Sequence, residues 1–324
     1  MVYSTIEFSL KVVRHHILCY IGQVIGWEIF SAYHTNRLGA QKKRPSNMEK
    51  EPEKLYLDLL KKSLSFTLWP EPPMPIMTLN YKRPFLRRTL IAAISSVLKA
   101  IGLQIVKKQK FTPNERSEGR VWPGYADTMI GLRRLDNLQS CIETVIKEGV
   151  EGDLIETGVW RGGACIFMRG VLAAYSVGDR RVFVADSFEG LPKPDLAKYA
   201  ADKGDELHKQ HLLSVSKAEV ERNFEKYGLL DKQVLFLKGW FKDTLPNAPI
   251  EKLSILRLDG DMYGSTMDAL INLYPKLSPG GFCIVDDYAV EGCRKAVDDY
   301  RSEHQIDAEI IEIDWTGIYW RKAQ

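Results

Sequence analysis

Five short apolar runs between residues 153 and 287 constrain the fold more than any other feature of the sequence. Each is rich in Val, Ile, Leu or Phe and ends in polar residues or glycine; in order, the runs are DLIET, RVFVADS, QVLFLKG, LSILRLDGD and GFCIVDD. Continuous apolar runs of this length are typical of parallel strands buried on both faces. Segments with a helical pattern, such as residues 265–277 and 292–304, separate the runs, as right-handed crossover connections require.

The C-terminal segment AEIIEIDWTGIYWRK predicts two further strands, joined by a turn at residues 314–317. The sequence therefore predicts an α/β fold with a doubly wound, mostly parallel sheet of seven strands that ends in an antiparallel C-terminal hairpin. In such sheets ligands bind beyond the carboxyl ends of the strands. We expect the functional residues where each apolar run ends.

The first run leads into the turn IETGVWRGG, after which a helical segment begins. Gly158, Gly162 and Gly163 allow the backbone to approach a ligand closely at the N-terminus of that helix, and Glu156 offers a carboxylate at the strand end. The spacing of these glycines differs from the dinucleotide motif G-x-G-x-x-G, so the turn alone does not identify the ligand.

The second run ends at Asp186. A carboxylate at this place can bind the two vicinal hydroxyls of a ribose, as the acidic residue of dinucleotide-binding folds does. The alternative is that Asp186 only caps the following helix. Glu156 would repel a pyrophosphate but not a zwitterionic amino acid, so the pattern favours S-adenosylmethionine over NAD as the cofactor.

The fourth and fifth runs place four carboxylates at neighbouring strand ends, those of Asp259, Asp261, Asp286 and Asp287. Acids this close would repel one another unless a cation lay between them, and hard divalent cations prefer oxygen ligands. The cluster predicts Mg²⁺ or a similar metal; the alternative is solvated loop acids that cap the following helices. A metal that lowers the pKa of a hydroxyl, with a carboxylate that accepts its proton, suits methyl transfer to oxygen.

These motifs resemble the macrocin O-methyltransferase family, the TylF/MycF-type sugar O-methyltransferases. The resemblance runs from about Lys54 to the C-terminus and rests on the blocks YLDLLKKSL, TMIGLRRLDNLQ, GDLIETGVWRGG, VFVADSFEGLP, NFEKYGLLDKQVLFLKGWFKDTLP, LRLDGDMYGSTMDAL and LSPGGFCIVDDY. It implies a class I methyltransferase with a Rossmann-like fold and a metal-dependent transfer of methyl from S-adenosylmethionine to a sugar hydroxyl.

The resemblance also implies roles for individual residues. Asp261 would be the general base. The metal ligands would be Asp259, Asp286 and Asp287. The cofactor-binding residues would be Thr128, Met129, Glu156, Gly158, Gly162, Asp186, Ser187 and Trp240.

Two features depart from the family pattern. Where the family reads AHTMIG this chain reads ADTMIG, so Asp127 replaces a histidine. Residues 1–52, expected to form a helical extension and a linker, have no family counterpart. Neither has a basic helical insertion at about residues 82–110 within the expected methyltransferase domain, residues 53–324. The insertion could lie on a membrane or pack against the domain or a partner subunit.

The net charge of +3 hides an asymmetry between the two parts of the chain. The first 120 residues contain 20 Lys and Arg against 9 Asp and Glu, and the remainder contains 25 against 33. A basic segment of this kind can meet an anionic membrane surface, nucleic acid or an acidic protein, or it can simply be solvated. We expect peripheral membrane contact and no nucleic acid as partner; a homo-oligomer stays open.

The cysteines favour a reducing, cytoplasmic compartment, because the five of them are widely spaced and form no CxxC pair. No run reaches the ~18 apolar residues of a membrane span, and we expect at most attachment to the inner membrane surface.

The acceptor could be a glycosylated small molecule, lipid or polysaccharide. His208 and His211 are expected on a solvated face. Two other functions stay open: a methyltransferase for catechols or phenols, and a non-catalytic, membrane-associated scaffold.

Overall fold

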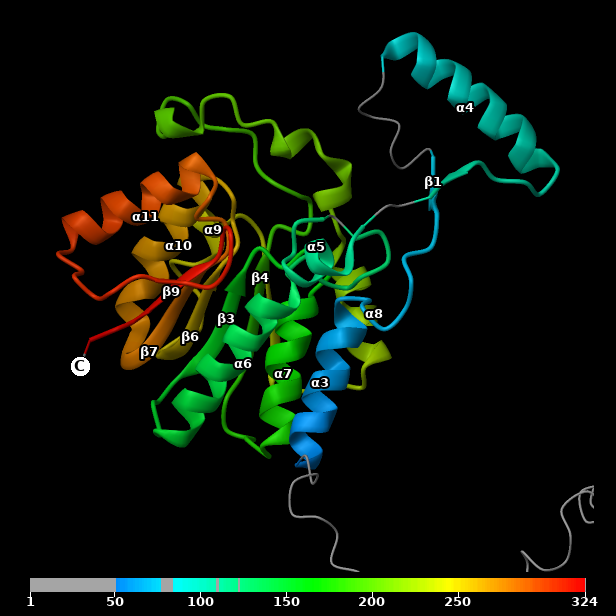
Figure 1. Cartoon of the computed structure of the whole chain (residues 1–324). Coiled ribbons are helices and arrows are strands. Elements are labelled where there is room, and N and C mark those ends of the chain that lie inside the picture. Colours follow the sequence, from blue (N-terminus) through cyan, green and yellow to red (C-terminus); the bar gives the residue numbers. More distant parts are fainter. Residues whose placement is uncertain (1–50, 77–83, 109–110, 122, 324) are drawn as a thin grey trace, which may run out of the picture. The chain divides into compact units, whose positions relative to one another are not determined.

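The structure, a computed structural model, describes residues 51–76, 84–108, 111–121 and 123–323 (Figure 1). Residues from Glu51 onward form one compact unit. The helical extension and linker expected at residues 1–52 lie outside the described residues, except for residues 51 and 52. The first described helix, α3 (Pro52–Leu64), begins with a proline at its first turn, where no backbone N–H is needed.

A sheet of seven strands forms the centre of the unit and confirms the predicted fold class. The strand order is β5-β4-β3-β6-β7-β9-β8; β3 to β7 are parallel to one another, and β9 runs antiparallel to both β7 and β8. The strands are β3 (Asp153–Thr157), β4 (Val182–Asp186), β5 (Val234–Lys238), β6 (Leu253–Leu258), β7 (Leu277–Val285), β8 (Ile311–Glu312) and β9 (Ile318–Arg321).

The direction of winding reverses between β3 and β6, which lie side by side in the sheet. Ligands of open α/β sheets bind at such a reversal, beyond the carboxyl ends of the strands. All six residues of β6 are buried, as a strand covered on both faces requires. The motifs that follow β3 and β6 therefore meet at the same edge of the sheet.

Helices cover both faces of the sheet (Figure 1). Side chains alternate along each strand: Leu154 and Val184 join one core with α3, α6 and α7, while Ile155 and Ala185 join the other with α10 and α11. The helices besides α3 are α4 (Phe85–Ala100), α5 (Pro113–Ser117), α6 (Leu132–Lys147), α7 (Gly163–Ala174), α8 (Lys217–Lys226), α9 (Phe241–Thr244), α10 (Tyr263–Leu273) and α11 (Glu291–Glu303). Short 3₁₀ turns are η2 (Ala200–Asp202), η3 (Leu207–Lys209), η4 (His211–Leu213) and η5 (Tyr274–Lys276).

The basic insertion is shorter as a helix than the sequence predicts. Helix α4 ends at Ala100, and Gly102 follows with a φ of 75°, a left-handed conformation that stops the helix although the apolar pattern continues. Beyond it the chain is extended, and β2 (Val106–Lys107) pairs antiparallel with β1 (Met74–Pro75). The expectation of one helix across residues 82–110 is therefore wrong for its last third.

Among the described residues, no helix has both the length and the apolarity needed to cross a bilayer. The described cysteines are all buried free thiols, those of Cys141, Cys165, Cys283 and Cys293. Cys19 lies outside the described residues.

Candidate functional site

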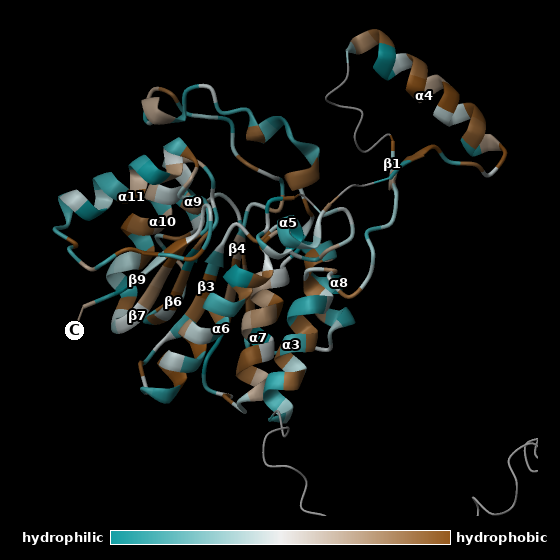
Figure 2. Cartoon of the chain, in the orientation of Figure 1, coloured by the Kyte–Doolittle hydropathy of each residue, from teal (hydrophilic) through white to brown (hydrophobic). Residues whose placement is uncertain are grey.

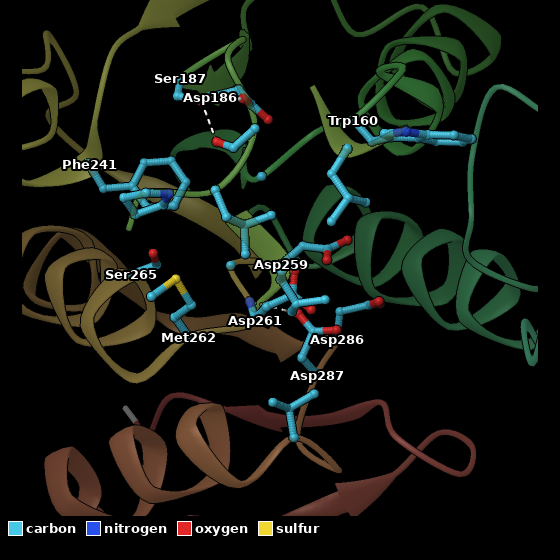
Figure 3. A pocket seen from close by; sticks show the side chains of 18 of the residues that line it. Trp160, Asp186, Ser187, Phe241, Asp259, Asp261, Met262, Ser265, Asp286 and Asp287 are labelled. Atoms are coloured by element: carbon cyan, nitrogen blue, oxygen red, sulfur yellow. Dashed lines mark hydrogen bonds between the residues drawn. The ribbon is translucent and has the colours of Figure 1, made fainter. Parts of the chain in front are cut away.

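A cavity of about 470 Å³ opens at the carboxyl ends of the central strands (Figure 3). Its size lies in the range of small-molecule sites. Most of the residues expected in the site line it, namely Thr128, Met129, Glu156, Gly158, Asp186, Ser187, Trp240, Asp259, Asp261, Asp286 and Asp287. Gly162 does not.

Gly158 holds the turn after β3 against the loop after β6. Its φ is 87°, and a Cβ built on it would lie 1.7 Å from the carbonyl oxygen of Asp259. The two loops are further joined because the N–H of Asp259 donates to the carbonyl oxygen of Thr157 at 2.9 Å. No residue with a side chain fits at Gly158 without moving one loop.

Gly162 has a structural role in addition to the cofactor contact that the sequence predicts. It is the N-cap of α7 with a φ of 85°, and a Cβ there would lie 2.6 Å from Cγ1 of Val220 on α8. The glycine thus permits a left-handed turn and close packing of α8. The structure does not bring it to the cavity wall, and its contact with a cofactor stays a prediction.

Asp186 ends β4 and organises the backbone on both sides of it. Its carboxylate accepts hydrogen bonds from the N–H of Val159 at 2.8 Å and from the N–H of Phe188 at 2.6 Å. Burial raises the pKa of Asp186, and these backbone donors oppose the rise. Each carboxylate oxygen has a second lone pair, so the group can also accept hydroxyls from a ligand in the cavity.

The four acids predicted from the strand ends gather in one place (Figure 3). Carboxylate oxygens of Asp259, Asp286 and Asp287 lie within 4.8 Å of one another. The N–H of Asp261 donates to Oδ2 of Asp287 at 3.1 Å, and Asp261 has a φ of 58°, a strained conformation that residues at functional sites often adopt.

The closeness of these carboxylates affects their pKa values. Burial and the neighbouring carboxylates raise the pKa of Asp259 to about 6 and that of Asp261 to about 8, and they raise the pKa of Asp287 well above its usual range. A cation among the carboxylates would remove the repulsion. The donor set, three carboxylates of converging loops, fits a hard divalent metal.

Arg257 was not predicted from the sequence and connects the two halves of the site. It is the next-to-last residue of β6, with its side chain 1% exposed, and it forms ion pairs with Glu156, Asp286 and Asp259, the last at 2.7 Å. The pair with Glu156 follows from the register, because the two residues are opposite each other on β6 and β3. Burial raises the pKa of Glu156 to about 7, against the lowering effect of Arg257.

A second buried guanidinium supports the same acids from α6. Arg134 forms an ion pair with Asp286 and another with Asp314 at 2.9 Å. Within this network two guanidinium groups face six carboxylates, those of Glu156, Asp259, Asp261, Asp286, Asp287 and Asp314. When these carboxylates are ionised, their charge exceeds that of the two guanidinium groups, and the excess suits a cationic ligand.

Residues 188–215, between β4 and α8, supply one wall of the cavity and are fastened to the domain by several contacts. The buried carboxylate of Asp202 accepts hydrogen bonds from the N–H of Tyr263 at 2.7 Å and of Gly264 at 3.0 Å, the first donors of α10. The indole N–H of Trp160 donates to the carbonyl oxygen of Leu212 at 2.8 Å. These contacts hold the 188–215 segment over the strand ends.

The turn between β8 and β9 supplies another wall. Thr316 donates its hydroxyl to the carbonyl oxygen of Asp286 at 3.0 Å, and the indole N–H of Trp315 donates to the carbonyl oxygen of Glu118 at 3.0 Å. The ring of Trp315 is 45% exposed and lines the cavity. The turn thus offers an aromatic surface at a fixed place relative to the acids.

Asp127, expected from the sequence to stand in place of a histidine, is not part of the cavity wall. Its carboxylate accepts a hydrogen bond from the hydroxyl of Tyr227 at 2.8 Å, and Asp127 is not a lining residue. His211 is exposed and His208 is half-buried, and neither lines the cavity. The carboxylate of Asp127 and the imidazoles of His208 and His211 are therefore absent from the cavity wall.

Comparison with known proteins gives a consistent result. The model of the family described as "Macrocin-O-methyltransferase (TylF)" matches residues 53–322. The mycinamicin III 3''-O-methyltransferase of Micromonospora griseorubida is 54% identical over 222 residues, which are 68% of this chain and 87% of that protein. The demethyldecarbamoylnovobiocin O-methyltransferase of Streptomyces niveus is 56% identical over 211 residues, 64% of this chain and 80% of that protein.

A third relative is similar over a longer part of the chain. The 8-demethyl-8-(2,3-dimethoxy-alpha-L-rhamnosyl)-tetracenomycin-C 4'-O-methyltransferase of Streptomyces olivaceus is 49% identical over 275 residues, 85% of this chain and 95% of that protein. Among solved structures, the O-methyltransferase NovP matches with a TM-score of 0.72 and 47% identity, covering 84% of this chain and all of that chain.

Proposed function

Because the chain belongs to the macrocin O-methyltransferase family, we propose that it transfers a methyl group from S-adenosylmethionine to a sugar hydroxyl of a glycosylated acceptor in a reaction that needs a divalent metal such as Mg²⁺. The family and the likeness to NovP make the chain an O-methyltransferase, and they support S-adenosylmethionine as its methyl donor. The acceptor and the metal are the proposed parts.

The observation that carries the metal is the convergence of Asp259, Asp286 and Asp287 within 4.8 Å. These residues would hold the ion, which supplies Lewis acidity that lowers the pKa of a hydroxyl. Asp261 follows on the same loop and would accept the proton of the acceptor hydroxyl. Arg134 and Arg257 hold the ligand carboxylates in place through their ion pairs.

The cofactor would lie on the β3 and β4 side of the cavity. There Asp186 would accept hydrogen bonds from the ribose hydroxyls, and the backbone next to Gly158 leaves room for close approach. Thr128, Met129, Ser187 and Trp240 line the same region and would contact the remainder of the cofactor. Glu156 is occupied by Arg257 and by the thiol of Cys165, which donates to it at 2.9 Å.

A sugar acceptor is supported by the names of the relatives, one of which is a rhamnosyl-tetracenomycin O-methyltransferase. The test is incubation of the full chain with S-adenosylmethionine, Mg²⁺ and the substrate of each named relative, followed by mass spectrometry for one added CH₂. The Asp261→Asn variant serves as the control for catalysis. Methylation of a simple catechol, with none of the glycosides accepted, would replace the proposal by the catechol alternative.

Contact of the basic N-terminal third with a membrane, a cytoplasmic location, the absence of a nucleic-acid partner and a homo-oligomeric state stay predictions.

A further inference from the structure

The segment of residues 72–114 has the most one-sided charge in the sequence. It contains eight Lys and Arg residues and no Asp or Glu. The described part of this segment contains the two short strands β1 and β2, which pair with each other, and helix α4 between them. None of the sixteen residues of α4 is buried in the described part of the chain.

Many residues of helix α4 are hydrophobic (Figure 2), and large apolar residues along one line of the helix are exposed in the described part of the chain. The exposed fractions of its large apolar residues are high along one line of the helix: Leu86 80%, Leu90 62%, Ile94 44%, Val97 68% and, at its C-cap, Ile101 67%. The spacing of four, four, three and four residues places them on one face. Soluble proteins seldom leave so continuous an apolar surface without a partner.

The basic side chains of α4 lie mainly across from this face. At about 100° per residue, Arg88 and Lys99 are on the opposite side of the helix from Leu90. Arg87 lies about 60° from Leu90 around the helix, at the edge of the apolar face, where a long cationic side chain can bury its stem and keep its charged end in the polar layer. This distribution is typical of a helix that lies in the plane of a membrane interface.

We propose that α4 is an interfacial helix that binds an anionic lipid surface, with the apolar face of Leu86, Leu90, Ile94 and Val97 among the acyl chains. Charge complementarity selects this occupant, because the helix and its flanks have cations and no acid. A second copy of α4 on the same face would bring two sets of cations together, with no acid on either segment to pair with them. A membrane span is excluded by the length and apolarity of the helix.

The test is flotation of the full chain with vesicles of phosphatidylcholine alone and of phosphatidylcholine mixed with phosphatidylglycerol. We expect binding to the anionic vesicles and at least tenfold weaker binding to the neutral ones. Raising the salt should weaken binding, since the screening length falls from about 10 Å at 0.1 M to about 3 Å at 1 M. Equal binding to both kinds of vesicle would overturn the proposal.

Two variants assign the binding to α4. Leu90→Asp should weaken binding to anionic vesicles at least tenfold, while Leu59→Asp, at a 57% exposed position on α3, should not change it. Lys99→Glu should weaken it roughly thirtyfold, since each Lys or Arg near an anionic surface contributes about fivefold, whereas Lys62→Glu on α3 should have little effect.

Residues 1–50 are identical in all these variants, so binding that survives Leu90→Asp would overturn the assignment to α4. Sedimentation equilibrium completes the test. If the parent chain forms a dimer but does not bind vesicles, and Leu90→Asp abolishes the dimer, then a second copy of the chain, and not lipid, covers the apolar face of α4. Thermal unfolding and S-adenosylhomocysteine binding should stay unchanged in every variant, which shows that the domain is folded.

Discussion

Replacing Arg257 by methionine tests the electrostatics of the site. Methionine has a similar length and no charge, so Arg257→Met removes the cation and leaves Glu156, Asp259 and Asp286 with one partner fewer in a buried place. Arg257 is 1% exposed and pairs with all three carboxylates. Breaking a buried ion pair from one side costs about 3–5 kcal/mol, because the remaining charges are left uncompensated.

The loss should be visible in thermal unfolding. For domains of this size 1 kcal/mol corresponds to about 2–4 °C, so the Tm should fall by about 6–20 °C. Arg133→Met is the matched control, because Arg133 is 58% exposed and its ion pair with Glu118 is 3.6 Å long. An exposed pair contributes about 0–1 kcal/mol.

The defect should depend on pH in a defined direction. Arg257 lowers the pKa of Glu156, which burial already raises to about 7, so its removal should raise that pKa further. The folded variant then binds more protons than the unfolded chain above the usual carboxyl pKa, and its stability falls as the pH rises. We expect a larger Tm difference from the parent at about pH 8 than at about pH 5. A loss below 1 kcal/mol, or a defect that grows on acidification, would refute the reasoning.

The remaining predictions concern the metal, the cofactor and the 188–215 segment. Asp286→Asn should lower turnover, and excess Mg²⁺ should partly restore it, while Asp261→Asn should lose ~10²–10⁴-fold in turnover without such rescue. Full activity in EDTA would contradict the need for a metal, and near-normal turnover of Asp261→Asn would show that another group is the base. Asp186→Ala should weaken S-adenosylhomocysteine binding by about 1–3 kcal/mol in calorimetry, since buried hydrogen-bond donors lose their acceptor. Tight binding of NAD in place of S-adenosylhomocysteine would contradict the assignment of the cofactor. Asp202→Ala removes the acceptor for two N–H groups of α10 and should destabilise the protein by about 0.5–2 kcal/mol and speed proteolysis within residues 188–215. Glu206→Gln, an exposed acid in the same segment, is its control, and equal cleavage of the two variants would show that Asp202 does not fasten the segment.

The strands and the acid cluster could be predicted because both depend on local pattern. A strand buried on both faces needs a continuous apolar run, and β6 is buried along its whole length. The carboxyl ends of parallel strands meet at one edge, so acids that follow two such runs come together without further information. Asp259 and Asp286 are the case in point.

The guanidinium partners depend on contacts between distant segments and were missed. Arg257 did leave a signal, as a charged residue within the apolar run LSILRLDGD. Its pairing with Glu156 required the register of β3 and β6, and Arg134 comes from a helix far away in the sequence. Gly162 shows a different difficulty. A glycine in a turn can allow a ligand to approach, adopt a left-handed φ or make room for a neighbouring helix, and the surrounding sequence does not distinguish these roles.

The contact of Gly158 with the carbonyl oxygen of Asp259 has a consequence for how members of such a family can diverge. The turn after β3 and the loop after β6, which bears Asp259 and Asp261, lie backbone against backbone at this point, so substitutions elsewhere in either loop leave their separation unchanged. We expect sequence variation in the 188–215 segment and around Trp315, which line the same cavity, because changes there could fit the proposed site to acceptors of different size without disturbing the contact at Gly158.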